Sequence, residues 1–200
     1  MLVPMLTPAP GRRRPAPTAL LAVADNMSEA MAAVRAGADL VDLGGAQRPA
    51  VAEFRARHPG VGVCAPDEAA DLVRHPALAI ATGALLICAD PGAARASALP
   101  AGQLIVEVMP DGVTAVAQAG WAALVDVDLA AELAEARRPA LVQADRAAAL
   151  AGIVAIAALS SWLDAAVVRT RHPLQVRRAL QMAAAISGRR PPARTVRGLA

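Results

Sequence analysis

The feature that most constrains the fold is a regular alternation of short apolar runs with alanine-rich stretches that can form helices. Eight apolar runs can be counted, at residues 18–24, 40–44, 61–65, 84–90, 104–110, 122–128, 139–145 and 165–170. Each run is apolar almost throughout, as expected for parallel strands that are covered on both faces. The alternation therefore predicts repeated strand–helix units around a parallel sheet.

Two of the intervening stretches carry recognisable helix signals. Residues 26–37 offer Asn26 as a residue that caps the start of a helix and Gly37 as one that ends it. Residues 66–75 read PDEAADLVRH, with Pro66 at or near a first helical turn. We expect a helix in both segments.

Eight strand–helix units predict an α/β protein with a (β/α)8 TIM barrel. The fold usually takes roughly 200 residues or more, so this barrel must be compact, with short loops. An open, doubly wound parallel sheet is the alternative. We expect residues 1–17 to be a flexible leader rich in proline and arginine, residues 18–188 to form the barrel, and residues 189–200 to be an Arg/Pro-rich tail.

The composition excludes several kinds of chemistry. All 20 basic residues are arginine, so Schiff-base chemistry and a lysine phosphate clamp are ruled out. The formal net charge is only +3, with arginines gathered at the two ends of the chain, which we interpret as polar tails. With one Phe, two Trp and no Tyr, the chain lacks platforms on which bases would stack, so no nucleic-acid partner is expected.

The cysteine spacing and the lack of a long apolar segment indicate where in the cell we expect the protein. Cys64 and Cys88 have neither metal-site nor disulfide-framework spacing, so we expect buried, reduced thiols. No run of 18 or more apolar residues is free of charge, and the first residues contain prolines and an arginine triplet where a signal peptide needs an apolar core. We expect a cytoplasmic protein with no membrane partner.

In this type of barrel a site is built just past the carboxyl ends of the strands. The residues expected there are Asp25, Asn26, Gly44 to Arg48, Cys64, Ala65, Asp90, Glu107, Asp126, Asp128, Asp145, Arg146 and Arg169 to His172. Such a ring of carboxylates and arginines can hold a polar heterocycle and an anion. It can equally be a solvated rim of internal ion pairs.

Two acids within the expected strands are the strongest candidates. If Asp126 is buried among the apolar residues of its run, it must be paired or bound to a ligand. Arg169 is its natural partner across the barrel mouth, so an ion pair closing an empty barrel and a ligand site both stay open. For Glu107, the parity of its strand decides whether the side chain points into the barrel or toward the helices.

The second-strand region and the C-terminal third of the chain resemble one known family. GADLVDLGGAQRP (37–49) resembles the second-strand motif of dihydropteroate synthases, and residues 139–146, 148–165, 166–186 and the tail resemble the ends of synthases from high-GC, actinobacterial-type organisms. The resemblance covers nearly the whole barrel in order. It implies a pterin-binding barrel, in which Mg²⁺ assists the condensation of a pterin pyrophosphate with p-aminobenzoate.

Position by position, the resemblance keeps few of the family's functional residues. It retains Asp126, Arg146, Arg169 and Arg48. The family's metal-linked asparagine is missing from AVADNM (22–27), its pterin-contacting aspartate falls on Cys64, and its Asn-Asp pair falls on Cys88 and Ala89. The strand-seven lysine is Ala147, and the phosphate-binding histidine is Arg171.

The chain therefore resembles a divergent, motif-depleted synthase paralogue. We expect a non-catalytic or accessory protein of folate metabolism, pairing with itself or with a synthase paralogue. The ligand expected is a pterin or an anion, such as a phosphate-bearing small molecule, held by Asp126, Arg146, Arg169, Arg171, Arg48 and Glu107. No metal ligand is assigned, and Mg²⁺ stays open.

Two other functions are kept as alternatives. One is an enzyme of different chemistry, acting on a phosphorylated or anionic small molecule. It would use Glu107, Asp126 and Asp128 as acids or Mg²⁺ ligands and the arginines of 169–171 as a phosphate clamp. The other is a divergent but active dihydropteroate synthase.

Overall fold

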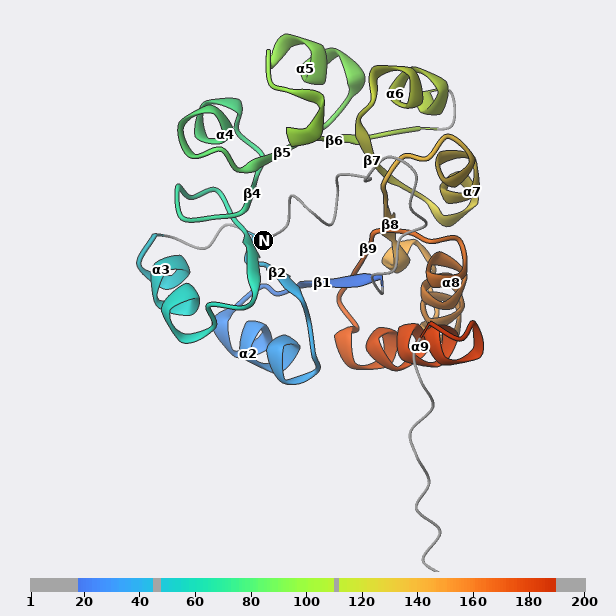
Figure 1. Cartoon of the computed structure of the whole chain (residues 1–200). Helices are drawn as coiled ribbons and strands as arrows, with labels where there is room; N and C mark the ends of the chain where they lie inside the picture. Colours follow the sequence, from blue (N-terminus) through green and yellow to red (C-terminus); the bar gives the residue numbers. More distant parts are fainter. Residues whose placement is uncertain (1–17, 45–47, 110–111, 190–200) are drawn as a thin grey trace, which may run out of the picture.

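The computed structural model describes residues 18–44, 48–109 and 112–189, without the side chains of residues 48 and 49. Within these ranges the strands are all parallel and close into a barrel in chain order, with eight described α-helices around it (Figure 1). The strands are β1 (Ala19–Val23), β2 (Leu40–Asp42), β3 (Gly62–Cys64), β4 (Leu72–Val73), β5 (Leu85–Cys88), β6 (Leu104–Glu107), β7 (Ala122–Val125), β8 (Ala140–Gln143) and β9 (Val167–Thr170). The predicted TIM-barrel fold is confirmed, with nine strands instead of eight.

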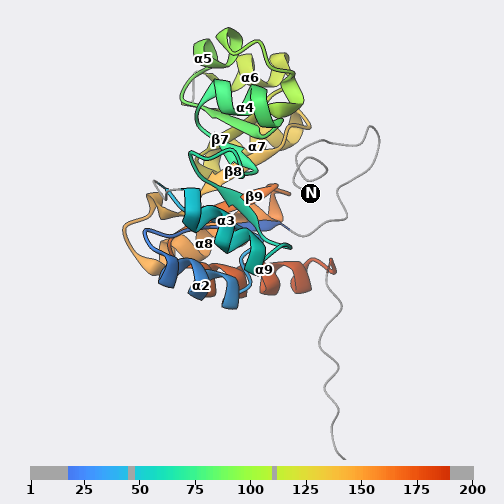
Figure 2. The same ribbon diagram turned by 90° about the vertical axis from the view of Figure 1, so that its left-hand side faces the viewer.

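The α-helices form a ring outside the strands. They are α2 (Met27–Arg35), α3 (Arg48–Arg57), α4 (Pro76–Thr82), α5 (Pro91–Ala96), α6 (Val113–Ala119), α7 (Val127–Glu135), α8 (Leu150–Trp162) and α9 (Pro173–Ile186). Two short 3-10 helices, η1 (Ala101–Gln103) and η3 (Ala144–Arg146), lie before β6 and after β8. Seen from the side, α2, α8 and α9 lie at one side of the barrel and α4, α5 and α6 at the other (Figure 2).

The ninth strand lies where a helix was predicted. Residues 66–75 form turns and then β4, so the helix prediction for this segment is wrong. The buried Asp67 carboxylate accepts a hydrogen bond from the backbone N–H of Ala69 (2.8 Å), a local turn that competes with helix formation. Pro76 also disfavours helical backbone at the residue before it. The short β4 then pairs with β3 and β5 and keeps the barrel closed.

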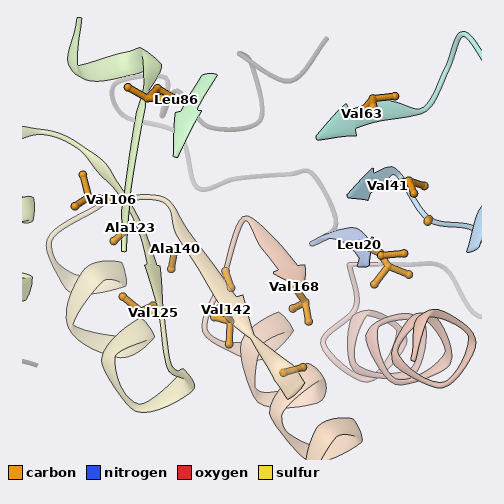
Figure 3. Packing of buried hydrophobic residues seen from close by; sticks show 14 of the residues in the cluster. Leu20, Val41, Val63, Leu86, Val106, Ala123, Val125, Ala140, Val142 and Val168 are labelled. Atoms are coloured by element: carbon orange, nitrogen blue, oxygen red, sulfur yellow. The ribbon is translucent and has the colours of Figure 1, made fainter. Parts of the chain in front are cut away.

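Alternate side chains of the strands form two apolar layers. One set fills the inside of the barrel and includes Leu21, Leu40, Leu72, Ile105 and Leu141. The other packs against the helices. It includes Leu20, Val41, Val63, Leu86, Val106, Ala123, Val125, Ala140, Val142 and Val168 (Figure 3). This burial on both faces explains why the strands are apolar throughout, and it leaves the polar residues for the strand ends.

The strands end earlier than the apolar runs predict. Asp90 and Asp126 lie beyond β5 and β7 and occupy the residue before the first turn of α5 and α7, while Asp145 lies in η3. The predicted start of α2 is confirmed, because Asn26 Oδ1 accepts a hydrogen bond from the Glu29 N–H (3.0 Å). Gly37 follows the end of α2 with a φ of 87°, a backbone conformation that suits glycine. None of the helices in the described ranges has the length and apolar character to cross a membrane.

Candidate functional site at the carboxyl ends of the strands

A buried ion pair lies at the centre of the barrel mouth. Arg169, on β9, donates to Asp42 Oδ2 at the end of β2 (2.9 Å) and to Gln143 Oε1 on β8 (3.2 Å). The Asp42 side chain is 7% exposed and that of Arg169 is 22% exposed. The other Asp42 oxygen accepts from the N–H of Gly44 (3.0 Å). The Arg169 guanidinium therefore has partners within the chain on both sides.

Asp42 is a residue that the sequence analysis missed. Asp42 lies in the predicted apolar run 40–44. It is the last residue of β2 and has the same parity as Leu40, whose side chain points into the barrel. Asp42 could have been recognised as a partner of Arg169 only with the strand order in hand. In the closed barrel β1 pairs with both β2 and β9, which brings the ends of these two strands close together. The predicted Asp126–Arg169 ion pair is wrong, because Asp42 is the carboxylate that Arg169 contacts.

Cys64 lies beside this ion pair on β3. Its side chain belongs to the barrel interior, and burial raises the pKa of the thiol to about 12, with the nearby Asp42 charge adding to the shift. A thiol with such a pKa is protonated at neutral pH and is a poor nucleophile. Burial also raises the pKa of Cys88. Both cysteines are free and buried, as predicted.

Asp126 is paired with the arginine of the neighbouring unit. Arg146 Nε lies 3.2 Å from Asp126 Oδ1, and both side chains are about half exposed. The expectation that Asp126 is buried inside a strand is therefore wrong, since β7 ends at Val125. Because the pair is exposed to water, its contribution to stability is small.

One ion pair and two hydrogen bonds lie around Arg171 on the rim. Arg171 Nη1 donates to Asp25 Oδ2 (2.5 Å), and this contact lowers the pKa of Asp25 and raises the pKa of Arg171. Asp145 accepts from Thr170 Oγ1 and from the Arg171 N–H, both at 2.7 Å. The two hydrogen bonds to the Asp145 carboxylate therefore stabilise the turn that leads from β9 into α9.

The remaining predicted site residues are placed differently. Glu107 ends β6 with the same parity as the interior residue Ile105, so it points inward, and it has no hydrogen-bond or ion-pair partner among the described residues. Asp128 lies in the first turn of α7. No three His, Cys, Asp or Glu side chains within 18–44, 48–109 and 112–189 form a metal-binding group, so Glu107, Asp126 and Asp128 are not gathered into one.

Arg48 begins α3, and its side chain lies outside the described residues, as do Gly45, Ala46 and Gln47. His172 precedes α9 and is exposed on the rim, as expected. A hollow of about 430 Å³ opens beside it, between α2 and the first turn of α9. Three alanines of α2 and its end line it, and its polar lining includes Glu29, Arg35 and Arg171.

Solved structures share this architecture across nearly the whole chain. Mycobacterium tuberculosis Rv1207 superimposes with a TM-score of 0.64 at 19% identity, covering 88% of this chain and 94% of that one. The Yersinia pestis dihydropteroate synthase gives a TM-score of 0.62 at 18% identity, covering 92% of this chain and 99% of that one. This chain has the dihydropteroate synthase fold. The Thermus thermophilus synthase, solved in complex with 6HMPPP, adds a TM-score of 0.63 at 18% identity, with 86% and 96% covered.

The likeness to these synthases concerns the fold, at identities below 20%. No protein-family model matches the sequence, and no curated protein matches it either. The synthase fold therefore supplies the frame of the site, while the chemistry must be argued from the side chains of this chain.

Proposed function

We propose that this chain is a non-catalytic or accessory protein of folate metabolism, built on the dihydropteroate synthase fold, that does not catalyse the synthase reaction. One observation carries the proposal: the three arginines that lie in or directly after β8 and β9 are each paired with a carboxylate of the same chain. The pairs are Arg169 with Asp42, Arg146 with Asp126, and Arg171 with Asp25.

These pairs bear directly on the synthase chemistry. Pyrophosphate carries several negative charges, and stabilising it as a leaving group requires cations that are free to receive them. Here a ligand phosphate must displace an aspartate from each arginine. Asp145 and Glu107 add two further carboxylates at these strand ends. The five acids then outnumber the three paired arginines and Arg74, which follows β4, so the local field disfavours a polyanion.

The sequence adds a second line of support. The positions that the family resemblance links to metal and pterin binding hold residues such as Cys64 and Ala147. Cys64 is a protonated thiol inside the barrel layer and cannot supply the charge of the aspartate that it replaces. The residues that we propose for any remaining pterin or anion are Asp126, Arg146, Arg169, Arg171, Arg48 and Glu107.

The experiment that tests the proposal is a product assay. The purified full chain is incubated with the pterin pyrophosphate, p-aminobenzoate and Mg²⁺, with the Yersinia pestis synthase as the positive control. We expect no dihydropteroate above the level of a reaction without enzyme. Product that increases with the amount of this chain, and that is lost in an Arg169→Leu variant, would overturn the proposal.

The cellular role that we propose is that of a partner protein in the cytoplasm. The chain pairs either with a second copy of itself or with an active synthase, and in both cases its contribution is binding. A synthase whose turnover changes on addition of this chain would identify the mixed assembly.

A second candidate function is the binding of an anionic small molecule by a barrel of different chemistry. The observation that favours it is the hollow beside Arg171, which also has Arg35 and His172 in its lining. Thermal unfolding with and without inorganic phosphate and Mg²⁺ tests this candidate. A ligand at a hundred times its Kd stabilises the fold by about 2.7 kcal/mol, which raises the Tm visibly. An unchanged Tm with both additives would exclude this candidate.

A further inference from the structure

A histidine and a methionine meet between two neighbouring helices on the outside of the barrel. Met31 lies in the middle of α2, and His58 is the residue that follows α3 (Figure 1). Nε2 of His58 and Sδ of Met31 are 3.1 Å apart, and both side chains are partly buried. Because His58 lies between the end of α3 and the start of β3, the contact is on the side of the strands' amino ends, away from the barrel mouth.

The local structure holds the imidazole ring of His58 in one place. Its backbone N–H donates to the carbonyl oxygen of Phe54 (2.9 Å), and its own carbonyl accepts from the N–H of Val61 (3.0 Å). The ring also packs against the ring of Phe54, with centroids 5.1 Å apart, and Phe54 is fully buried. Nε2 therefore faces α2 in a fixed orientation, as a preorganised ligand atom does.

An imidazole nitrogen and a thioether sulfur are weak partners for one another but good ligands for a soft cation. A thioether is only a weak hydrogen-bond acceptor. Thioether ligands select Cu(I), and imidazole also suits copper. With metal bonds of about 2.0 Å to nitrogen and about 2.3 Å to sulfur, the lengths that first-row metals such as zinc make, atoms 3.1 Å apart subtend roughly 90° at one ion. The two atoms thus have the separation of adjacent ligands.

Met27 supplies a third soft donor on the same face of α2. It lies four residues before Met31, and residues at this spacing are neighbours on the surface of a helix. Both methionines are partly buried against the same apolar core. Methionine is unbranched and has three rotatable bonds, so its sulfur can reach a ligand without a change in the backbone. Two thioethers and one imidazole make a set of three neutral donors.

The charges around these donors favour a soft monovalent ion. Each of the helices α2 and α3, which the described ranges include, has one acid. Glu29 caps the start of α2, and Glu53 pairs with Arg57, so both are engaged. Hard cations such as Mg²⁺ and Ca²⁺ need oxygen ligands. Within the same ranges no three His, Cys, Asp or Glu side chains form a group that would hold zinc. Neutral soft donors suit Cu(I) instead.

We propose that Met27, Met31 and His58 bind one soft monovalent cation of the Cu(I) class between α2 and α3. The site goes beyond the proposed function and uses none of the charged residues at the barrel mouth. Its test measures metal binding and not turnover, so its outcome does not depend on whether the chain catalyses the synthase reaction.

The test uses Ag⁺ as the probe, because it is a soft monovalent ion that is stable in air. The full chain is labelled with ¹³C at the methionine methyl groups, and the resonances are assigned with Met→Leu variants. We expect one equivalent of Ag⁺ to shift the resonances of Met27 and Met31. Those of the exposed Met109 and Met182 should stay in place. Mg²⁺ should shift none of the four.

Single substitutions assign the ligands. Met31→Leu and His58→Gln should each raise the Kd for Ag⁺ about tenfold or more, since even the loss of a residue behind a metal ligand costs about 10- to 100-fold in affinity. Met182→Leu, which removes an exposed thioether on α9, is the matched control and should leave the Kd unchanged. The double variant Cys64→Ala, Cys88→Ala should bind as wild type does, because no thiol belongs to the site. Circular dichroism checks that each variant is folded.

Three results would contradict the site. Methyl resonances that do not move with Ag⁺ would show that the contact of Met31 with His58 is a hydrogen bond alone, and would overturn the proposal. An unchanged Kd in folded Met31→Leu or His58→Gln would overturn it as well, as would binding that is lost in the folded cysteine double variant. A shift of Met31 without a shift of Met27 would overturn the site with three donors.

Discussion

At the scale of single residues, the pair between Asp42 and Arg169 has the largest energetic role at the mouth. Both side chains are mostly withdrawn from water, and each has further hydrogen bonds, to Gly44 N–H and to Gln143. Removing one partner of such a pair leaves a buried charge without compensation, which costs far more than the pair itself contributes.

We therefore expect Asp42→Ala to lower the free energy of unfolding by about 3 kcal/mol, measured by urea denaturation. The matched control is Glu53→Ala, which removes one partner of the exposed Glu53–Arg57 pair on α3 and should cost less than about 0.5 kcal/mol. The double variant Asp42→Leu, Arg169→Met should recover much of the lost stability, because no unpaired charge is left. Equal losses from Asp42→Ala and Glu53→Ala would contradict the buried pair.

The Cys64 thiol gives a pH dependence with a defined sign. Its pKa is about 12 in the folded chain against an ordinary value of 9.0. Between these two pH values the thiol keeps its proton in the folded state and loses it in the unfolded state. The contribution of Cys64 to the free energy of unfolding is complete below pH 9. It decreases by about 1.4 kcal/mol per pH unit as the pH rises from 9 toward 12. The chain contains no lysine and no tyrosine, so the two cysteines are the side chains that titrate in this range.

Urea unfolding between pH 8 and pH 10.5 checks this prediction. Wild type should lose stability above pH 9, Cys64→Ala should show a smaller slope, and the double variant Cys64→Ala, Cys88→Ala should show almost none. The comparison uses slopes and not absolute stabilities, since both substitutions also leave cavities. A wild-type stability that stays constant to pH 10.5 would show that Cys64 is not buried as described.

At the scale of the elements, local signals explain where the helices begin. Asn26 and Glu29 form a reciprocal cap at α2, in which Asn26 Oδ1 accepts from the Glu29 N–H and Glu29 Oε2 accepts from the Asp25 N–H (2.9 Å). We expect Asn26→Ala to destabilise the protein by about 1 kcal/mol. Ser28→Ala, at an exposed position of the same helix, should change stability by less than about 0.5 kcal/mol in the same thermal and urea unfolding experiments. A similar effect of both substitutions would show that the cap does not stabilise α2.

The sequence predicts the elements well where one local signal acts alone. The apolar runs located eight of the strands, because burial on both faces leaves a near-continuous pattern. The ninth strand was missed because β4 is only Leu72–Val73, too short for any periodicity, and because it follows residues of good helix propensity. The turn at Asp67 and the pairing of β4 with β3 and β5 determine the conformation of residues 66–75. Pairing between strands cannot be seen in a local sequence pattern.

At the scale of the whole molecule, the sequence predicts where the site residues lie but not which residues they contact. The sequence placed Arg146, Arg169 and Arg171 at strand ends, and the structure has them there. It did not predict their partners, because pairing depends on which strands are neighbours in the closed barrel. Asp42 reaches Arg169 from a strand 127 residues away in sequence, with β1 between them.

These pairings make one claim about the molecule as a whole: carboxylates of the same chain neutralise the three arginines in and directly after β8 and β9. The measurement that tests this most directly is a calorimetric titration of the full chain with pyrophosphate, with and without Mg²⁺, in wild type and in Asp42→Asn. We predict no saturable binding to wild type. Weak binding should arise in Asp42→Asn, where Arg169 loses its carboxylate. Saturable binding of pyrophosphate to wild type that disappears in Arg169→Leu would contradict the account.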